Sequence, residues 1–258
     1  MTRGATRIVA VIPARYQSVR FPGKMLARQT GKPLIQHVYE RARGAASVAE
    51  VLIATDDERI AEAARAFGAL VVMTRTDHAN GTSRIAEAID GIPCDIVVNV
   101  QGDEPELDPG IIDAAIDALV SDPSAVVSTV ISPFAPGEDP SNPNVVKCVC
   151  AATAGGLRAL FFSRSVIPCD RDGLGSAAAA QPMKHVGLYV YRREFLAEFV
   201  RLSPTPIEQT EHLEQLRILE HGHTIAVAIR VTHAQGIDTP AQYEQFVARY
   251  RALTAGSA

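Results

Sequence analysis

Residues 8–110 alternate short apolar runs with segments of helical periodicity, and this rhythm most constrains how the chain can fold. The run Ile8–Ile12 is unbroken and apolar, as in strands buried within a parallel sheet. Similar runs predict strands over residues 51–54, 70–73 and 96–100. Strands and helices that alternate in this way form a mostly parallel, Rossmann-like α/β sheet with helices on both faces.

Proline and glycine mark the helix boundaries between these strands. Pro33 opens a helix that ends at Gly44, and an alanine-rich helix ends at Gly68. A short helix is predicted over residues 85–89, and Asp108 is placed to cap another helix.

The second half of the chain reads as a β-rich extension of the same domain. Its predicted strands cover residues 126–131, 145–149, 158–162, 186–191 and 224–231. Thr205–Glu208 has the pattern of a capping box and predicts a helix that continues to about Leu219. Thr239–Gln242 is a second such box and opens a C-terminal helix. We therefore expect one domain over residues 1–258, with a nucleotide-binding part at about 8–120 and a second part at about 121–250.

Composition and charge exclude several classes of protein. The net charge is −4 and the pI about 6.0, which argues against bulk nucleic-acid binding, so an anionic substrate must be held by a local basic cluster. The first apolar run is too short for a signal peptide, and no later run is long enough to span a bilayer. A cytoplasmic protein without membrane partners is expected.

A basic loop follows the first strand and is the best candidate for a phosphate site. It carries Arg15, Arg20 and Lys24 among prolines and glycine, and ligands bind beyond the carboxyl ends of the strands in such sheets. Polyphosphate needs cations and close backbone N–H groups. The alternative is a solvated basic loop, and we expect Lys24 to be exposed. The glycine-rich motifs of dinucleotide dehydrogenases and P-loop kinases are absent.

An acidic turn, Gln101–Pro105, follows the fourth strand. Asp103 within it is well placed for Mg²⁺, which prefers one or two carboxylates together with substrate phosphates. The alternative is a plain turn, since Gly, Asp and Pro all favour turns.

Seven segments together resemble one enzyme family. In chain order they are IPARYQSVRFPGKML, NVQGDEP, Asn142–Lys147 (NPNVVK), FSRSVIP, HVGLYVYR, EQTEHLEQLRIL and GIDTPAQ. The chain resembles the 3-deoxy-manno-octulosonate cytidylyltransferases, also called CMP-KDO synthetases, from Ile8 to Tyr250. One departure is Cys169, where the family pattern has tryptophan.

The resemblance implies a nucleotidyltransferase fold and a defined reaction. The family joins CTP to KDO (3-deoxy-D-manno-octulosonate), giving CMP-KDO and pyrophosphate, and so activates KDO for lipopolysaccharide synthesis. It further implies a Mg²⁺ cofactor, CTP and KDO as small-molecule substrates, no nucleic-acid partner, and a homodimer.

The resemblance also implies a role for each matching residue. Lys24, Asp103 and Asp238 would be catalytic, with Asp103 and Asp238 as magnesium ligands. The nucleotide would be held by Arg15, Arg20, Lys24, Ser83 and Arg84, the last two within the loop His78–Arg84. The sugar would be bound by Gln101, Arg164, His185, Tyr189, Glu214 and Gln215, with Arg164 on its carboxylate.

Residue chemistry is compatible with the sugar site but does not require it. An arginine fork suits a carboxylate. On one continuous helix, Glu211, Glu214 and Gln215 would share a stripe, although a plain amphipathic helix gives the same pattern. His185 and Tyr189 share a face of one predicted strand, where two ordinary, partly buried side chains are equally compatible.

Three rival functions fit parts of the pattern. They are a cytidylyltransferase for another sugar acid such as sialic acid, a non-catalytic nucleotide-sensing module, and a glycosyltransferase on a similar sheet. Paired metal-binding aspartates argue against the sensor, and pyrophosphate release would exclude the glycosyltransferase.

Overall fold

The computed structural model describes residues 6–172 and 180–255 and divides the chain into two compact units. Unit 1 comprises Met1–Gly110 and Ala234–Ala258, and unit 2 comprises Ile111–His233. The C-terminal segment thus belongs with the first unit, whereas the sequence-based division grouped most of it with the second part.

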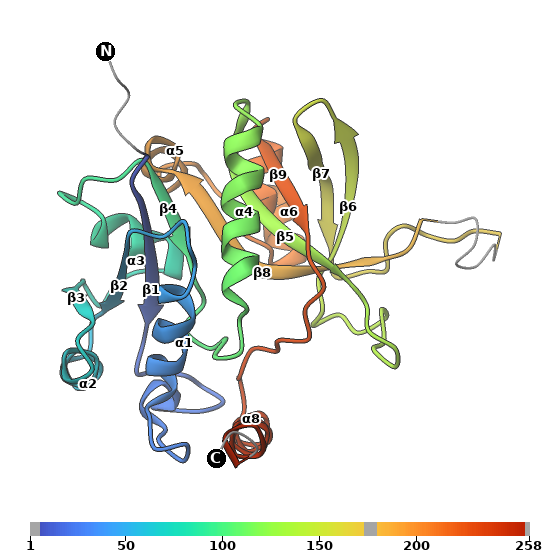
Figure 1. Ribbon diagram of the computed structural model, residues 1–258. Coiled ribbons are helices and arrows are strands. Elements are labelled where there is room, and N and C mark those ends of the chain that lie inside the picture. Colours follow the sequence, from blue (N-terminus) through green and yellow to red (C-terminus); the bar gives the residue numbers. More distant parts are fainter. Residues whose placement is uncertain (1–5, 173–179, 256–258) are drawn as a thin grey trace. The chain divides into compact units, whose positions relative to one another are not determined.

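The sheet of unit 1 is parallel throughout, as the alternating pattern predicts (Figure 1). Its strands are β1 (Ile8–Ala14), β2 (Glu50–Thr55), β3 (Leu70–Met73) and β4 (Ile96–Asn99), in the order β3-β2-β1-β4. The central strand β1 is buried along almost its whole length, because β2 and β4 pair with its two edges and helices pack against it. The α/β fold class is confirmed.

The helices of unit 1 begin and end close to the proline and glycine residues that were expected to bound them. They are η1 (Lys24–Leu26), α1 (Leu34–Arg43), α2 (Glu58–Ala66), α3 (Gly81–Ala88) and α8 (Pro240–Ala255). Helix α3 starts before the predicted residues 85–89, because the Asn80 side chain caps it by accepting from the Ser83 N–H at 2.8 Å.

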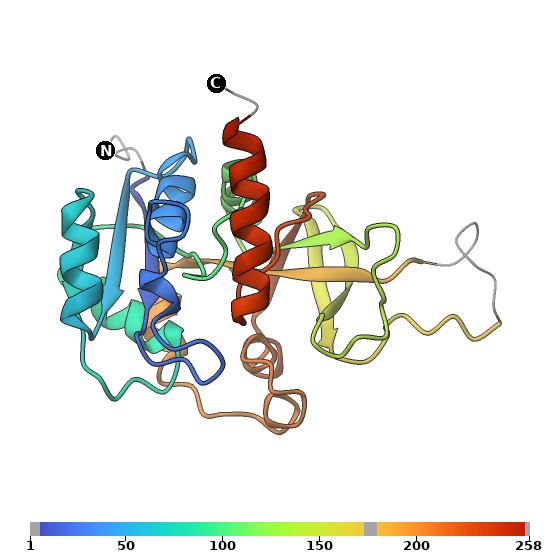
Figure 2. The same cartoon turned by 90° about the horizontal axis from the view of Figure 1, so that it is seen from below.

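Helix α8 is fixed to unit 1 at its start and along one face (Figure 2). The predicted capping box is present, because Thr239 N–H donates to the Gln242 side chain at 3.0 Å and Gln242 N–H donates to Thr239 Oγ1 at 3.3 Å. Tyr243 and Phe246 then pack against Leu34 of α1. This packing explains why the end of the chain belongs with the first unit.

Unit 2 is built on five strands of mixed direction. They are β5 (Ala125–Pro133), β6 (Lys147–Thr153), β7 (Gly156–Ser163), β8 (Met183–Arg192) and β9 (Thr224–Ile229). The order is β8-β5-β9-β7-β6, and β6 also pairs with β8, so the pairing returns to its first strand. Four of the five pairings are antiparallel, and only β5–β9 is parallel, which matches the predicted β-rich extension.

The helices of unit 2 correct one prediction. They are α4 (Pro109–Ser121), which begins at the boundary of unit 1, α5 (Arg193–Phe199), α6 (Pro206–Glu211) and α7 (Gln215–Glu220). A single helix from Thr205 to about Leu219 is wrong, because His212 adopts a left-handed conformation with φ of 52° and ends α6. Glu211 therefore does not share a continuous helical stripe with Gln215.

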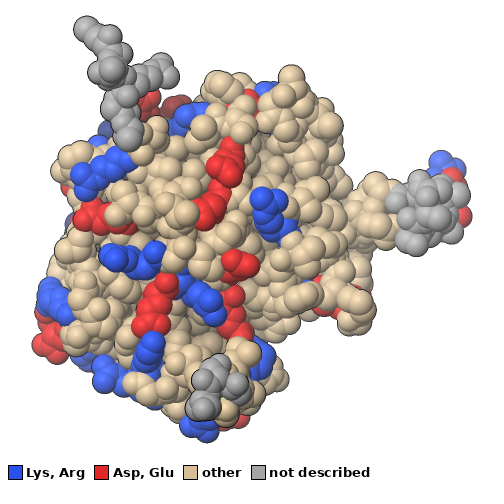
Figure 3. Space-filling model, in the orientation of Figure 1, with Lys and Arg blue, Asp and Glu red and all other residues tan. Residues whose placement is uncertain are grey.

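Charge and hydropathy in the structure agree with the composition. On the face drawn in Figure 3, lysines and arginines are interspersed with acidic side chains. No helix within residues 6–172 and 180–255 is both long enough and apolar enough to cross a membrane.

Asp122 gives unit 2 an acid-sensitive ion pair, and its mutation yields a first prediction. Its carboxylate accepts from Arg158 Nε at 2.7 Å and from Ser124, and the Arg158 bond holds the Asp122 pKa at about 2. We expect Asp122→Asn to reduce the free energy of unfolding at pH 7 by on the order of 1 kcal/mol.

The pH dependence of that loss follows from the sign of the shift. A depressed carboxyl pKa stabilises the fold above the ordinary value of 3.8, and this stability is lost as pH falls toward 2. Urea unfolding of wild type and variant should therefore converge between about pH 4 and pH 2. Asp117→Asn, an exposed change on α4, is the matched control. A difference that persists unchanged at low pH would contradict this account.

Candidate active site

The phosphate loop, residues 15–24, is shaped by the backbone beyond β1. Gly23 N–H donates to the Tyr16 carbonyl at 3.0 Å, and Gly23 has a φ of 70°, which only glycine adopts without strain. A β-carbon there would also lie 3.2 Å from the Tyr16 ring. The loop thereby delivers Lys24 to the start of η1.

Lys24 forms the centre of a charged cluster beyond the carboxyl ends of β1 and β4. Its ammonium donates to Asp103 Oδ2 at 2.8 Å, to the Ile237 carbonyl at 2.8 Å and to Asp238 Oδ1 at 3.4 Å. Lys24 is only 6% exposed, so the expectation of an exposed lysine is wrong. Two carboxylates and a carbonyl replace the water that would otherwise solvate the ammonium.

Asp238 reaches this cluster because two contacts fix the C-terminal segment. Ile237 N–H donates to the Asp103 carbonyl at 2.9 Å, and Asp238 N–H donates to the Gln242 side chain at 2.8 Å. The second carboxylate oxygen of Asp238 pairs with Arg20 at 2.9 Å. The structure thus brings together four of the predicted residues, Arg20, Lys24, Asp103 and Asp238.

Asp103 and Asp238 supply carboxylate oxygens, the donors that a hard divalent cation prefers. Asp103 and Asp238 each place an oxygen within 3.4 Å of one nitrogen, so both carboxylates face the same small volume. Within the described part of the chain, no three His, Cys, Asp or Glu side chains form a group that could hold a metal. Two carboxylates suit Mg²⁺, which takes its remaining ligands from phosphates and water.

Next to this cluster lies a cavity of about 240 Å³. It is lined by Pro13, Arg15, Gln17, Ser18, Lys24, Met25, Gly81, Gln101, Gly102 and Asp103. A β-carbon on Gly102 would lie 2.9 Å from the Pro13 carbonyl, so the chain can approach this closely only at glycine. Gln101, predicted to contact the sugar, therefore shares a cavity with two predicted phosphate ligands, Arg15 and Lys24.

A second cavity, of about 560 Å³, borders the other part of the phosphate loop. It shares Arg15, Gln17 and Ser18 with the first cavity and is walled by Asp56 and Asp57. The two cavities together flank Arg15 and give the loop two faces for a ligand.

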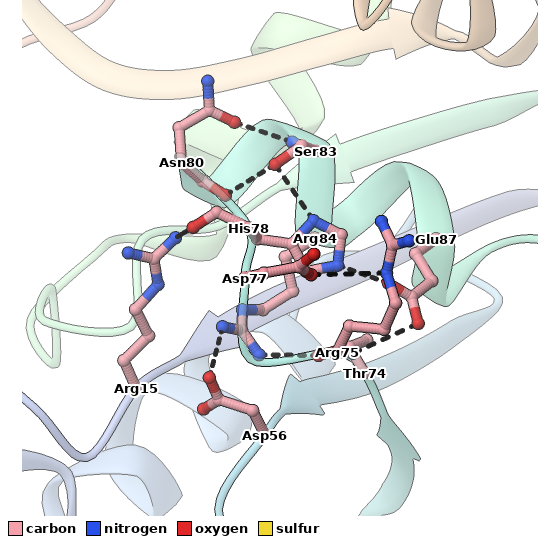
Figure 4. A network of polar contacts seen from close by, with 10 residues as sticks. All are labelled: Arg15, Asp56, Thr74, Arg75, Asp77, His78, Asn80, Ser83, Arg84 and Glu87. Carbon is pink, nitrogen blue, oxygen red and sulfur yellow. Dashed lines mark hydrogen bonds and ion pairs between the residues drawn. The ribbon is translucent and has the colours of Figure 1, made fainter.

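The loop His78–Arg84 is held by a polar network (Figure 4). Arg15 donates to the His78 carbonyl at 2.8 Å, and the His78 ring contacts Ser83 Oγ at 3.1 Å and the carboxylate of Glu87. The Ser83 hydroxyl lies 3.1 Å from the Asn80 carbonyl. Ser83 therefore acts within the loop that orients Arg15.

Arg84 is buried at the end of the loop His78–Arg84. It is fully buried, donates to Asp56 at 2.8 Å and to Thr74 Oγ1 at 2.6 Å, and borders neither of the two cavities (Figure 4). In this structure Arg84 fixes the residues around the loop. The nucleotide contact expected of Arg84 from the sequence stays a prediction.

In unit 2, His185 and Tyr189 lie together, as predicted, with ring centroids 5.3 Å apart. Burial lowers the pKa of His185 to about 3, so its ring is neutral. The Thr129 hydroxyl donates to the Leu188 carbonyl at 2.7 Å, and it accepts from His185 Nε2 at 2.8 Å. Nδ1 of His185 is then the acceptor nitrogen. Burial raises the pKa of Tyr189, which keeps its hydroxyl a donor.

Arg164 lies just beyond β7 and is held by backbone carbonyls. Its guanidinium donates to Glu211 O at 2.7 Å, to Pro143 O at 3.0 Å and to His212 O at 3.3 Å. The Glu211 carboxylate accepts from the Arg164 N–H at 2.9 Å and from Ser163 Oγ at 2.6 Å. Glu211 thus secures the arginine, a role that the predicted single helix did not reveal.

Glu214 and Gln215 stand at the beginning of α7. Glu214 is the N-cap of this helix, and Gln215, its first residue, is only 5% exposed. The sequence pattern placed the pair correctly at a helix but could not show that the helix starts there.

Comparison with known proteins decides the family. The cytidylyltransferase family model matches residues 9–225. The 3-deoxy-manno-octulosonate cytidylyltransferase of Geobacter metallireducens is 49% identical over 93% of this chain and 96% of its own length. That of Pelobacter propionicus is 49% identical over 95% and 98%. The chain belongs to the 3-deoxy-manno-octulosonate cytidylyltransferases. The resemblance expected from the sequence motifs is thereby confirmed.

The similarity of this chain to solved structures supports the same family assignment. The structure of a CMP:2-keto-3-deoxy-manno-octonic acid synthetase complexed with CTP matches with a TM-score of 0.88 and 42% identity, covering 98% of this chain and 100% of that one. A 4-diphosphocytidyl-2C-methyl-D-erythritol synthase from Anaerococcus prevotii, at 11% identity and a TM-score of 0.62, shares the fold.

One acidic residue of this cytidylyltransferase carries a shifted pKa that the sequence did not indicate. Burial, with the neighbouring Asp103 charge, raises the pKa of Glu104 to about 7. Its place in an acidic turn was visible in the sequence, but its partial burial was not.

Proposed function

We propose that this protein transfers CMP from CTP to KDO, releasing pyrophosphate and activating the sugar for lipopolysaccharide synthesis. The observation that carries the proposal is the cluster in which Lys24 joins Asp103 and Asp238 beyond the ends of β1 and β4. The names of the relatives, at nearly full coverage, supply the substrates.

On the nucleotide side, Arg15, Arg20 and Lys24 neutralise the triphosphate. Lys24 supplies a point charge, and the arginines supply planar forks that match phosphate oxygens. Ser83 acts indirectly, since its loop presents the His78 carbonyl that orients Arg15. Arg84 anchors the same loop through Asp56.

We propose Mg²⁺ as the cofactor, held by Asp103 and Asp238. When bound, it screens the phosphates and lowers the pKa of the attacking hydroxyl. The two carboxylates would hold this charge, and Lys24 forms ion pairs with both of them.

On the sugar side, the residues of unit 2 offer a set of groups that complements a polyol acid. Arg164 provides donors for the carboxylate, and His185 Nδ1 accepts from a hydroxyl. Tyr189 donates, while Glu214 and Gln215 add polar groups at the start of α7. Gln101, which was also expected to contact the sugar, lines the cavity of unit 1 that Lys24 borders. The reaction is in-line attack of the anomeric hydroxyl on the α-phosphorus, and positioning supplies much of the rate.

A pyrophosphate-release assay tests the proposal. Release is expected with CTP, KDO and Mg²⁺ together, and should fall at least tenfold, roughly, with ATP or GTP, where base contacts are lost. Sialic acid in place of KDO, and no sugar, are the comparison arms. Background release with CTP and KDO, or preferred turnover of sialic acid, would overturn the assignment.

We further propose that the protein works in the cytoplasm as a homodimer. Sedimentation equilibrium measures the second point directly, and a monomer at working concentration would contradict it.

A further inference from the structure

Lys147, at the start of β6, is a fully buried cation, and among the residues that the structure describes no carboxylate is in hydrogen-bond contact with it. Its ammonium donates to Val145 O at 2.8 Å, to Asn142 O at 3.2 Å and to Arg164 O. An ammonium has three N–H groups, so these three carbonyls satisfy it completely.

This burial is costly, and neutral acceptors compensate only part of the cost. A buried cation contributes little net stability compared with an apolar side chain of similar volume. Its three acceptors come from two separate segments, a turn at residues 142–145 and the end of β7. Lys147 therefore acts chiefly on geometry, because it ties these two segments together.

The turn at residues 142–145 also accepts a hydrogen bond from the guanidinium of Arg164. Arg164 Nη1 donates to Pro143 O at 3.0 Å, while Lys147 holds the carbonyls of Asn142 and Val145 on either side. Lys147 also fixes the carbonyl of Arg164, and Glu211 fixes its N–H at 2.9 Å. Both the backbone of Arg164 and one support of its side chain thus depend on the lysine.

We infer that Lys147 is a positioning residue that sets the orientation of Arg164 toward the sugar carboxylate. The inference rests on the proposed function, in which Arg164 binds that carboxylate. It requires no contact between Lys147 and the substrate.

Kinetics of Lys147→Met test the inference. The KM for KDO should rise on the order of tenfold to a hundredfold, since misplacement of a positioning group by about 1 Å has effects of this size. The KM for CTP and the kcat at saturating KDO should change little. Lys184→Met is the matched control, because Lys184 is also buried and pairs in register with Lys147, but it binds Glu138 instead. It should leave both KM values unchanged.

A double-mutant cycle distinguishes positioning from general damage. If Lys147 acts through Arg164, Lys147→Met should add nothing to the KM for KDO in an Arg164→Met background. Additive effects, a wild-type KM in Lys147→Met, or equal rises for KDO and CTP would overturn the inference. If Lys147→Met does not fold, Lys147→Gln, which keeps two N–H donors, takes its place in the cycle.

The same proteins separate failure of this inference from failure of the proposed function. No KDO-dependent turnover in wild type would refute the function. In that case a thermal-unfolding cycle of the same four proteins, which needs no substrate, still tests the link. Coupling between Lys147 and Arg164 would support it, and additive losses would overturn it.

Discussion

Lys24→Met is expected to lower turnover by roughly a hundredfold to a thousandfold, the range found when one preorganised charge is removed from a reacting centre. The variant loses the cation proposed to meet the triphosphate. It also leaves Asp103 and Asp238 facing one another without the ammonium that now lies between them. Steady-state kcat and KM for CTP, measured with saturating KDO, give the effect.

Stability must be measured alongside, because Lys24 is buried. Both aspartates are partly exposed, so we expect a loss of about 1–2 kcal/mol in the free energy of unfolding rather than the full cost of a deeply buried pair. Lys32→Met is the matched control, since Lys32 forms an exposed pair with Glu40 on the same unit. Wild-type kinetics in a folded Lys24→Met protein would show that the lysine is only structural.

Asp238→Asn should also cause a large loss, and one that depends on magnesium. An amide is a weaker ligand than a carboxylate for a hard dication, so half-maximal activity should require about tenfold more Mg²⁺. If Asp238 merely supported the start of α8, the variant would have a lower melting temperature and an unchanged magnesium titration. The Thr239–Gln242 box already caps that helix, which makes the structural role alone insufficient.

The control for this titration is Asp90→Asn, an exposed aspartate beyond α3. It should overlay wild type in both magnesium dependence and melting temperature. A titration of Asp238→Asn that also overlays wild type would refute a metal site shared with Asp103.

The sequence predicted those parts of the structure that depend on local pattern. Strands β1 to β4 were visible as apolar runs, and the box at Thr239 placed Asp238 just outside a helix. A strand-end rule then predicted that Asp103 and the phosphate loop lie at the same edge of the sheet. Each of these features depends on residues that are close together in the chain, so the sequence pattern alone is enough to predict it.

Features set by distant partners were not predictable. Lys24 was expected to be exposed. Its burial was not predictable, because it depends on Ile237 and Asp238, which lie more than 200 residues away in the sequence. The left-handed conformation of His212, which ends α6, was not predictable either, since glycine is the usual residue at such a helix end. Nothing in the local sequence around Arg84 predicts that it is buried and paired with Asp56.

The return of the C-terminal segment to unit 1 has a consequence for the order of events during synthesis. Strands β1 to β4 are made first, and unit 2 follows them, yet Ile237, Asp238 and α8 are translated last. Domains generally fold in the order in which they leave the ribosome. Unit 1 cannot finish folding before unit 2 is made, because Ile237 and Asp238, two partners of Lys24, are translated after unit 2. The nascent chain therefore lacks two of the groups that surround Lys24, the Ile237 carbonyl and the Asp238 carboxylate, until unit 2 has been translated.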